Sequence, residues 1–263
     1  MSEVLLTGAS GQLGRVVAPA LAVAGHGVRA LSREGRADDG PVRWVRGDLA
    51  TGAGLAEAVA GADAVVHLAS APYRRGYTRQ VDVEGTYRLA AAARAAGVGH
   101  LVYVSIVGVD AVPWGYYRVK LAAEEAVRTS GVGWTVLRAT QFHTFPDQIF
   151  AATARLGALV VDPGIRVQTV DLDDVAARLA EIVAAGPSGQ VLELCGPEVF
   201  DMGEIARQWL HARGLRRPVV RMRVPGRLGR AFRADSLVTD AVPRGAGTWG
   251  EYLQRTAMRR SRA

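Results

Sequence analysis

Short apolar runs alternate with amphipathic stretches along the first 140 residues of the chain. Glycines end most of the amphipathic stretches, as they do at helix C-termini. This alternation predicts a parallel sheet covered by helices. The predicted strands are Val4–Leu6, Val28–Leu31, Val42–Val45, Ala64–Leu68, Leu101–Val104 and Trp134–Leu137, and the predicted helices are Leu13–Ala24, Leu55–Ala60, Val81–Ala96 and Tyr116–Thr129.

The spacing of the apolar runs loosens after residue 140. Asp173 and Asp201 precede amphipathic stretches and are candidate N-caps. We expect a basic, irregular segment beyond residue 224. Before it, the pattern predicts helices at Asp147–Leu156, Asp173–Ala185 and Met202–Arg213, and extended segments at Val167–Val170, Val191–Leu194 and Pro218–Val224.

A glycine-rich turn, T-G-A-S-G-Q-L-G, joins the first predicted strand to the first predicted helix. Gly8 permits a tight turn, Gly11 lets the backbone approach a pyrophosphate, and Gly14 lets the helix pack close to the strand. The free N–H groups and partial positive charge of the helix N-terminus favour an anion there. The turn therefore predicts a dinucleotide site formed by Thr7, Gly8, Ser10, Gly11, Gln12, Leu13 and Gly14.

The second predicted strand ends in Ser32 and Arg33, with no acidic residue at its tip. An Asp or Glu at this point would hold the ribose 2′-hydroxyl of NAD. A guanidinium instead suits a 2′-phosphate, through bidentate hydrogen bonds. We therefore expect NADP(H) as the cofactor in preference to NAD(H), with Ser32 and Arg33 among its ligands.

Together these features predict an α/β fold with a doubly wound, Rossmann-like parallel sheet. Residues 1–140 would form the NAD(P)-binding Rossmann domain. Residues 141–263 would form a small C-terminal substrate-side subdomain that completes the single fold.

The same order of motifs resembles the atypical short-chain dehydrogenase/reductase superfamily, and within it the NmrA-like or NAD(P)H-binding branch. The resemblance extends over nearly the whole chain. It rests on the turn at Thr7–Gly14 and on the later motifs Gly47-Asp48-Leu49, Val66-His67-Leu68-Ala69, Asp82-Val83-Glu84-Gly85-Thr86, Tyr103-Val104-Ser105, and Tyr116 with Lys120.

The resemblance implies roles for individual residues. Asp48 would contact the adenine amino group beside Leu49, and Ala69 and Ser70 would lie against the adenosine ribose. Ser105 would end the strand that faces the nicotinamide. Extended members of the family carry Asn at the start of the motif that begins here with Asp82, which puts any water-relay role of that Asn in doubt.

Tyr116 and Lys120 are four positions apart and so share one face of a helix. A nearby ammonium lowers the pKa of a phenol, so Tyr116 is a candidate proton donor to a carbonyl oxygen as hydride arrives. Lys120 would also hold the nicotinamide ribose, and Ser105 would complete the catalytic group. Tyr117 is a rival for the tyrosine role. The spacing from Ser105 is shorter than in catalytic members, and Ile106 stands where many of them have a second hydroxyl.

The segment after the sixth predicted strand supplies candidates for a substrate pocket: Gln141, Phe142 and His143. The leading hypothesis is an NADPH-dependent reductase that transfers hydride to a carbonyl, a quinone or an activated double bond of an apolar small molecule. Two alternatives stay open: a non-catalytic redox sensor that acts through a protein partner, and a redox-neutral enzyme of the epimerase or dehydratase type.

Composition narrows the remaining choices. The net charge is +7, yet no helix combines a basic stripe with aromatic residues, so we expect no nucleic-acid partner. The single Cys195 and five dispersed histidines offer no metal site. No apolar run approaches the ~20 residues that span a bilayer, and no secretory pattern opens the chain. We therefore expect a cytoplasmic protein without membrane association, and the resemblance implies pairing of two copies through helices.

Overall fold

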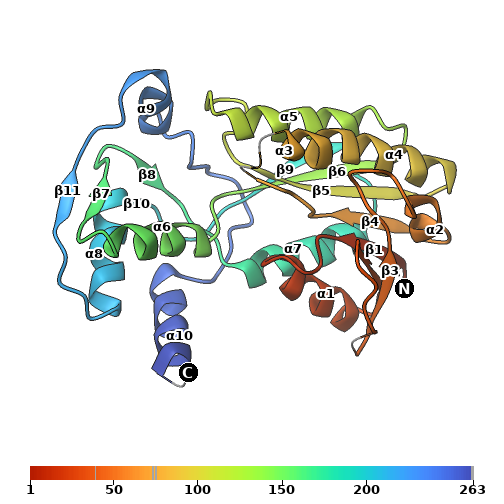
Figure 1. The fold of residues 1–263 in the computed structure, drawn as a ribbon, viewed down its shortest axis with the longest axis horizontal. Helices are drawn as coiled ribbons and strands as arrows, with labels where there is room; N and C mark the ends of the chain where they lie inside the picture. Colours follow the sequence, from red (N-terminus) through yellow and green to blue (C-terminus); the bar gives the residue numbers. More distant parts are fainter. Residues whose placement is uncertain (39, 73, 75, 262–263) are drawn as a thin grey trace. The chain divides into compact units, whose positions relative to one another are not determined.

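The computed structural model describes residues 1–38, 40–72, 74 and 76–261. Seven strands form one sheet in the order β3-β2-β1-β4-β5-β6-β9 (Figure 1), and the pairings of β1 with β2 and β4, of β2 with β3 and of β4 with β5 are parallel. The strands are β1 (Glu3–Thr7), β2 (Gly27–Ser32), β3 (Val42–Arg46), β4 (Ala64–His67), β5 (His100–Ile106), β6 (Trp134–Ala139) and β9 (Gln190–Leu194). The doubly wound α/β prediction is confirmed.

Helices cover both faces of this sheet (Figure 1). Helices α1 (Gly14–Val23) and α7 (Leu172–Ala185) lie on one face, and α4 (Gly85–Ala95) and α5 (Gly115–Arg128) lie on the other. The chain reverses its direction of winding between β1 and β4. In such sheets ligands bind at this switch point, outside the carboxyl ends of the strands.

Apolar side chains from the sheet and from α2 (Leu55–Val59), α4 and α5 form the core on one face. Leu5, Val65 and Leu101 come from three strands, and Leu89 and Val127 come from two of the helices that pack on them. All five are fully buried. This packing fixes the strand ends that carry the candidate site.

The helix predicted over Val81–Ala96 is interrupted at its start. Helix α3 (Tyr77–Arg79) leads into a π-helical turn, η1 (Gln80–Glu84), and α4 begins only at Gly85. Single π-turns often occur at functional sites. Here the turn carries Asp82, which is 1% exposed.

The prediction of an irregular segment after residue 224 is wrong. Helices α9 (Gly226–Arg233) and α10 (Trp249–Ser261) occupy much of it. Trp249 and Leu253 stand one helical turn apart and are buried in a second apolar cluster with Phe150, Ile205 and Trp209. Burial of this face stabilises α10, whose basic composition alone gives a weak helix signal.

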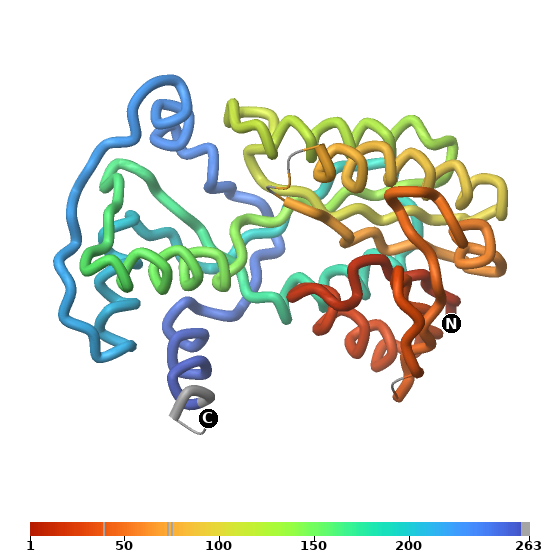
Figure 2. The backbone as a smooth tube through the Cα atoms, viewed as in Figure 1, coloured from red at the N-terminus to blue at the C-terminus, as the bar shows by residue number. Residues whose placement is uncertain are grey.

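By its internal contacts the chain forms two compact units. The first comprises residues 1–105, 115–138 and 175–192, and the second comprises residues 106–114, 139–174 and 193–263. Figure 2 traces the chain from β1, in red, to α10, in blue. The predicted division into an NAD(P)-binding domain, residues 1–140, and a substrate-side subdomain, residues 141–263, remains a prediction.

Besides α9 and α10, the second unit contains α6 (Thr144–Ala154) and α8 (Met202–Ala212). It also contains two small sheets, formed by β8 (Arg166–Val167) with β10 (Phe200–Asp201) and by β7 (Leu159–Val161) with β11 (Val219–Arg221). The Asp201 side chain caps α8 as predicted, because it accepts from the N–H of Glu204, whose own carboxylate accepts from the N–H of Asp201.

Candidate functional site

The glycine-rich turn between β1 and α1 is packed against the end of β4. Gly8 has φ +72°, and a Cβ there would lie 2.7 Å from the Ala69 nitrogen. A Cβ on Gly14 would overlap the carbonyl oxygen of Gly8. Both positions therefore require glycine, and no side chain caps the N-terminus of α1. The exposed Ser10 and Gly11 leave this end of the helix open to an anion.

A buried histidine holds this turn in place. The His67 Nδ1 atom lies 2.6 Å from Thr7 Oγ1, and its Nε2 atom lies 2.9 Å from Thr86 Oγ1. Because the Thr86 hydroxyl donates to the Asp82 carbonyl oxygen, Nε2 must carry the imidazole proton and Nδ1 must accept from Thr7. The Thr7 oxygen in turn accepts from the N–H of Ala69. This chain of hydrogen bonds joins the ends of β1 and β4 to η1.

Burial lowers the pKa of His67 to about 3, and the positive charge of Lys120 acts in the same direction. The imidazole is therefore neutral at physiological pH. Both ring nitrogens are engaged, so His67 stabilises the turn and has no proton to exchange with a ligand.

A groove of about 560 Å³ opens beside the turn, within the first unit. Its size suits a small-molecule or cofactor site. It is lined by the glycine-rich turn, the ends of β2 and β4, and the segments that follow β3 and β4: Thr7, Gly8, Ser10, Gly11, Leu31, Ser32, Arg33, Glu34, Arg36, Gly47, Asp48, Leu49, Leu68, Ala69, Ser70, Ala71, Pro72, Arg74, Tyr77 and Val81.

Cationic side chains gather where the groove passes the end of β2. Arg33 and Arg36 line it just after β2, Arg74 lines it from the segment after β4, and the acidic Glu34 is also a lining residue. The Arg33 guanidinium donates to the Tyr77 hydroxyl at 2.8 Å, which holds it across the groove. Arg33 was predictable from its place at the end of the second strand, whereas no spacing rule links Arg36 or Arg74 to that strand.

Most of the predicted cofactor residues line this groove: Thr7, Gly8, Ser10, Gly11, Ser32, Arg33, Asp48, Leu49, Ala69 and Ser70. Gln12, Leu13, Gly14 and Lys120 are not among its lining residues in the described part of the chain. Asp48 accepts hydrogen bonds from the Ala50 N–H and the Thr51 hydroxyl, at 2.9 and 3.3 Å. Its carboxylate therefore also shapes the turn after β3.

A hydrogen-bonded chain of three side chains lies at one end of the groove. The Tyr116 hydroxyl is 2.8 Å from Ser70 Oγ, and Ser70 Oγ donates to a carboxylate oxygen of Asp82 at 2.5 Å. The other oxygen of Asp82 accepts from the N–H of Ala71 at 2.8 Å. Tyr117, the rival tyrosine, is 2% exposed and belongs to the core.

Lys120 points into the interior of the first unit. Its Nζ atom donates to the Val104 carbonyl oxygen at 2.7 Å and lies 4.1 Å from the centre of the Tyr103 ring. Burial lowers the pKa of Lys120 to about 8, while the charges of Asp82 and Glu124 oppose the shift. The helical spacing brings Tyr116 and Lys120 to one side of α5, but at different depths.

Ser105 is the last residue but one of β5, and its hydroxyl is buried. Within the described residues this hydroxyl has no hydrogen-bond partner. An orphaned buried hydroxyl in a native fold calls for a ligand or water. Ser105 is not among the lining residues of the groove, whose glycine-rich turn and three arginines fit a dinucleotide.

The predicted pocket residues Gln141, Phe142 and His143 belong to the second unit. His143 is 2% exposed, with Nε2 donating to the Gly247 carbonyl oxygen at 3.2 Å and Nδ1 accepting from Thr169 at 2.7 Å. Burial lowers the pKa of His143 although the Gly247 hydrogen bond opposes this. The half-buried Phe142 forms a β-bridge with Val170.

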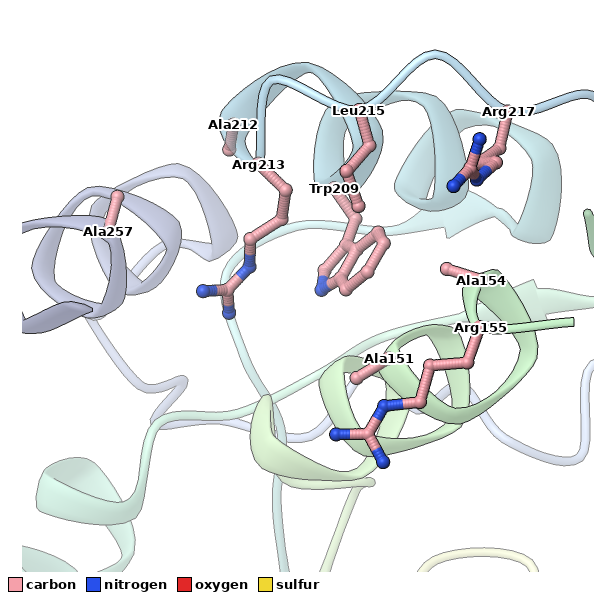
Figure 3. Close-up of a pocket in the computed structure, with 9 residues that line it drawn as sticks. All are labelled: Ala151, Ala154, Arg155, Trp209, Ala212, Arg213, Leu215, Arg217 and Ala257. Atoms are coloured by element: carbon pink, nitrogen blue, oxygen red, sulfur yellow. The ribbon is translucent and has the colours of Figure 1, made fainter. Parts of the chain in front are cut away.

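A second cavity, of about 440 Å³, lies within the second unit (Figure 3). Trp209 points from α8 toward α6, which carries Ala151, Ala154 and, at its end, Arg155. The Arg213 guanidinium is paired with Asp147 at 2.7 Å. Lacking a glycine-rich turn or a proton donor among its lining residues, this cavity is a weaker candidate than the groove at β1.

The strand order, the turn and the groove at the switch point define a Rossmann-type dinucleotide-binding protein. Residues 8–185 match the model of the NAD(P)H-binding family. The chain belongs to this family, which confirms the resemblance to the NmrA-like branch of the atypical short-chain dehydrogenases/reductases.

Several curated relatives are reductases. The (4-alkanoyl-5-oxo-2,5-dihydrofuran-3-yl)methyl phosphate reductase of Streptomyces griseus is 34% identical over 260 residues, covering 91% of this chain and 78% of its own. The 2-alkyl-3-oxoalkanoate reductase of Stenotrophomonas maltophilia is 32% identical over 250 residues, covering 81% and 76%. This chain is accordingly an NAD(P)H-dependent oxidoreductase that acts on a small molecule.

Solved structures agree on the fold. The NADPH-dependent quinone oxidoreductase of Escherichia coli has a TM-score of 0.75 at 20% identity, with 96% of this chain and 99% of that one aligned. WbmH of Bordetella bronchiseptica, solved with NAD+, has a TM-score of 0.76 at 19% identity, with 98% and 99% aligned.

None of the helices in the described part of the chain has the length and apolar character needed to cross a membrane. Across the same residues, His, Cys, Asp and Glu side chains nowhere gather in a group that could hold a metal ion.

Proposed function

We propose that this oxidoreductase binds NADPH in the groove of the first unit and reduces a carbonyl compound that carries an alkyl chain. The observation that carries the cofactor choice is the set of three arginines that line the groove, two of them directly after β2. The relatives named as reductases of an oxoalkanoate and of an alkanoyl furanone support the substrate class. Quinones and activated double bonds remain the alternatives.

In this proposal the pyrophosphate lies at the N-terminus of α1, over Gly8, Ser10 and Gly11, with Thr7, Gln12, Leu13 and Gly14 shaping the turn. Arg33, Arg36 and Arg74 hold the 2′-phosphate, beside Ser32. Asp48, Leu49, Ala69 and Ser70 flank the adenosine. When bound, NADPH supplies the hydride.

The chain's own residues handle the proton. Tyr116 donates its phenolic proton to the carbonyl oxygen as the alcohol forms, and water restores it. Lys120 keeps one N–H on the Val104 carbonyl oxygen and has two further donors for ribose hydroxyls. Ser105 offers its hydroxyl near the end of β5. Gln141, Phe142 and His143, in the second unit, remain the proposed substrate-pocket residues.

The cofactor test compares NADPH with NADH. Charge-assisted hydrogen bonds are worth roughly 1.5–3 kcal/mol each, so Arg33→Ala should weaken NADPH binding by about 10–100-fold and leave NADH binding nearly unchanged. Arg79→Ala is the matched control, since Arg79 is exposed and does not line the groove. Calorimetry with both nucleotides gives the two affinities. Equal losses for both in Arg33→Ala would refute the choice of NADPH.

The reaction test follows NADPH absorbance with a panel of alkyl ketones, quinones and enones. We expect oxidation with the ketones, and a loss of about 100-fold or more in kcat for Tyr116→Phe. Full turnover by Tyr116→Phe would remove the tyrosine from the mechanism. Tight NADPH binding without oxidation across the panel would favour the redox-sensor alternative.

The working state of the protein is also part of the proposal. We place it in the cytoplasm as a homodimer without nucleic-acid partners. Light scattering coupled to size exclusion measures the oligomeric state, and a monomer at micromolar concentration would contradict the dimer.

A further inference from the structure

Asp82 stands where the extended family members named above carry Asn, and its carboxylate is buried in η1, the turn before α4. One oxygen accepts from the Ala71 N–H and the other from the Ser70 hydroxyl, at 2.8 and 2.5 Å. An ionised carboxylate has no proton to donate. The Ser70 hydrogen is therefore committed to Asp82.

This commitment fixes the direction of the next hydrogen bond. Ser70 has a single hydrogen, so its oxygen can only accept from the Tyr116 hydroxyl, 2.8 Å away. If Tyr116 ionises, the phenolate faces a serine oxygen whose hydrogen points elsewhere, with a carboxylate behind it. Both the missing donor and the like charge disfavour the phenolate.

We propose that Asp82, acting through Ser70, keeps Tyr116 in its protonated form and so extends proton donation by this enzyme to alkaline pH. Asp82 is a positioning residue: it orients a hydroxyl and touches neither substrate nor cofactor. This inference rests on the role of Tyr116 in the proposed function. An Asn at position 82 would reverse the direction of these hydrogen bonds, because its amide N–H could donate to Ser70 and leave the serine hydrogen free to donate to the phenolate.

Other charged groups also act on this end of the site. The ammonium of Lys120 and the carboxylate of Glu124 come from α5, and Tyr103 and His67 come from the strands beneath. Lys120 favours the phenolate, and Glu124 opposes it. The charge of Asp82 raises the pKa of both Lys120 and Tyr103, so Asp82→Asn also removes these through-space effects, and a Ser70→Ala background is needed to separate them from the hydrogen-bond chain.

The experiment measures kcat/KM for NADPH-dependent ketone reduction as a function of pH. The alkaline limit is the pH at which kcat/KM falls to half of its maximum on the high-pH side. We expect Asp82→Asn to move this limit down by ~1 pH unit or more, the size of shift that a neighbouring charge produces. Glu84→Gln is the control, since Glu84 is an exposed acid on the same turn. An Asp82→Asn limit equal to that of the wild type would overturn the proposal.

A second pair of variants tests whether Asp82 acts through the serine. In a Ser70→Ala background, Asp82→Asn should cause no further shift, because the link is already broken. An undiminished shift in that background would overturn the proposal in favour of direct repulsion. Thermal unfolding of each variant checks that the fold is retained.

A readout without turnover separates this inference from the proposed function. Absorbance at the tyrosinate band, taken as the difference between each protein and its Tyr116→Phe counterpart, follows the ionisation of Tyr116 alone. If no panel compound is reduced, the proposed function fails. A lower ionisation midpoint in Asp82→Asn still supports the hydrogen-bond chain, and an equal midpoint refutes it.

Discussion

The buried imidazole of His67 should make the cofactor-binding unit sensitive to acid. The pKa of His67 is about 3 in the folded protein, against an ordinary value of 6.5. Between pH 6.5 and pH 3 the unfolded chain therefore binds a proton at this imidazole, whereas the folded chain does not. The stabilisation is complete above pH 6.5 and is lost as the pH falls toward 3.

The size of this loss follows from the shift. Each pH unit below 6.5 costs about 1.4 kcal/mol, so the protein should lose about 2 kcal/mol between pH 8 and pH 5 from this group. His67→Gln removes the titration, although it also lowers stability at every pH by disturbing the bonds to Thr7 and Thr86. The informative quantity is the difference in unfolding free energy between wild type and variant, which should shrink by about 2 kcal/mol at pH 5.

Urea unfolding followed by circular dichroism at the two pH values supplies these free energies. The control is His211→Gln, because His211 is exposed on α8. Burial also lowers the pKa of His100, to about 4, but His100 is present in every variant and cancels. A difference between wild type and His67→Gln that is the same at pH 8 and pH 5 would refute the reasoning.

Three further predictions follow from packing and charge. Gly14→Ala should lower the unfolding free energy by about 1–3 kcal/mol and weaken NADPH binding, because the new Cβ would overlap backbone atoms. The control Gly35→Ala, which has open space around it, should leave the melting temperature unchanged. Equal melting temperatures for the two variants would contradict this. Glu124→Gln should cost about 1.5–3 kcal/mol in urea unfolding by removing the charge that the buried Glu124 presents to the part-buried Arg138, while the exposed Glu125→Gln should stay within about 0.5 kcal/mol. Equal unfolding free energies for Glu124→Gln and Glu125→Gln would contradict this prediction. The pKa of Lys120 is about 8 in the folded protein, so the unfolded chain keeps this proton to higher pH. The unfolding free energy of the wild type, relative to that of Lys120→Met, should therefore rise by about 2 kcal/mol from pH 8 to pH 9.5. A difference that does not change with pH would contradict this.

The part of the fold that follows local pattern was predictable from the sequence. The alternation of apolar runs and helices located the first six strands of the main sheet, and the glycine spacing located the turn at α1. These features depend on contacts between neighbouring elements. Helix α10 was missed because Trp249 and Leu253 are buried with Phe150 and Trp209, residues at least 40 positions away.

The candidate site shows the same limit. Tyr116 was found from its spacing to Lys120, but sequence spacing could not show that Lys120 points under Tyr103. The link from Tyr116 to Ser70 spans 46 positions, and the link from Ser70 to Asp82 spans 12. The sequence showed that Asp82 stands in place of the family's Asn, but only the structure shows that its carboxylate accepts from Ser70.

One carboxylate in the second unit joins three helices. Asp147, on α6, accepts from the Trp209 indole and the Arg213 guanidinium at the end of α8, and from the Tyr252 hydroxyl on α10. A chain shortened to end before α10 would lose the tyrosine and leave the Trp209 and Phe150 rings facing water. Truncation or protease cleavage between α9 and α10 should therefore yield an aggregating fragment rather than a trimmed enzyme, because the last helix completes the core of the second unit.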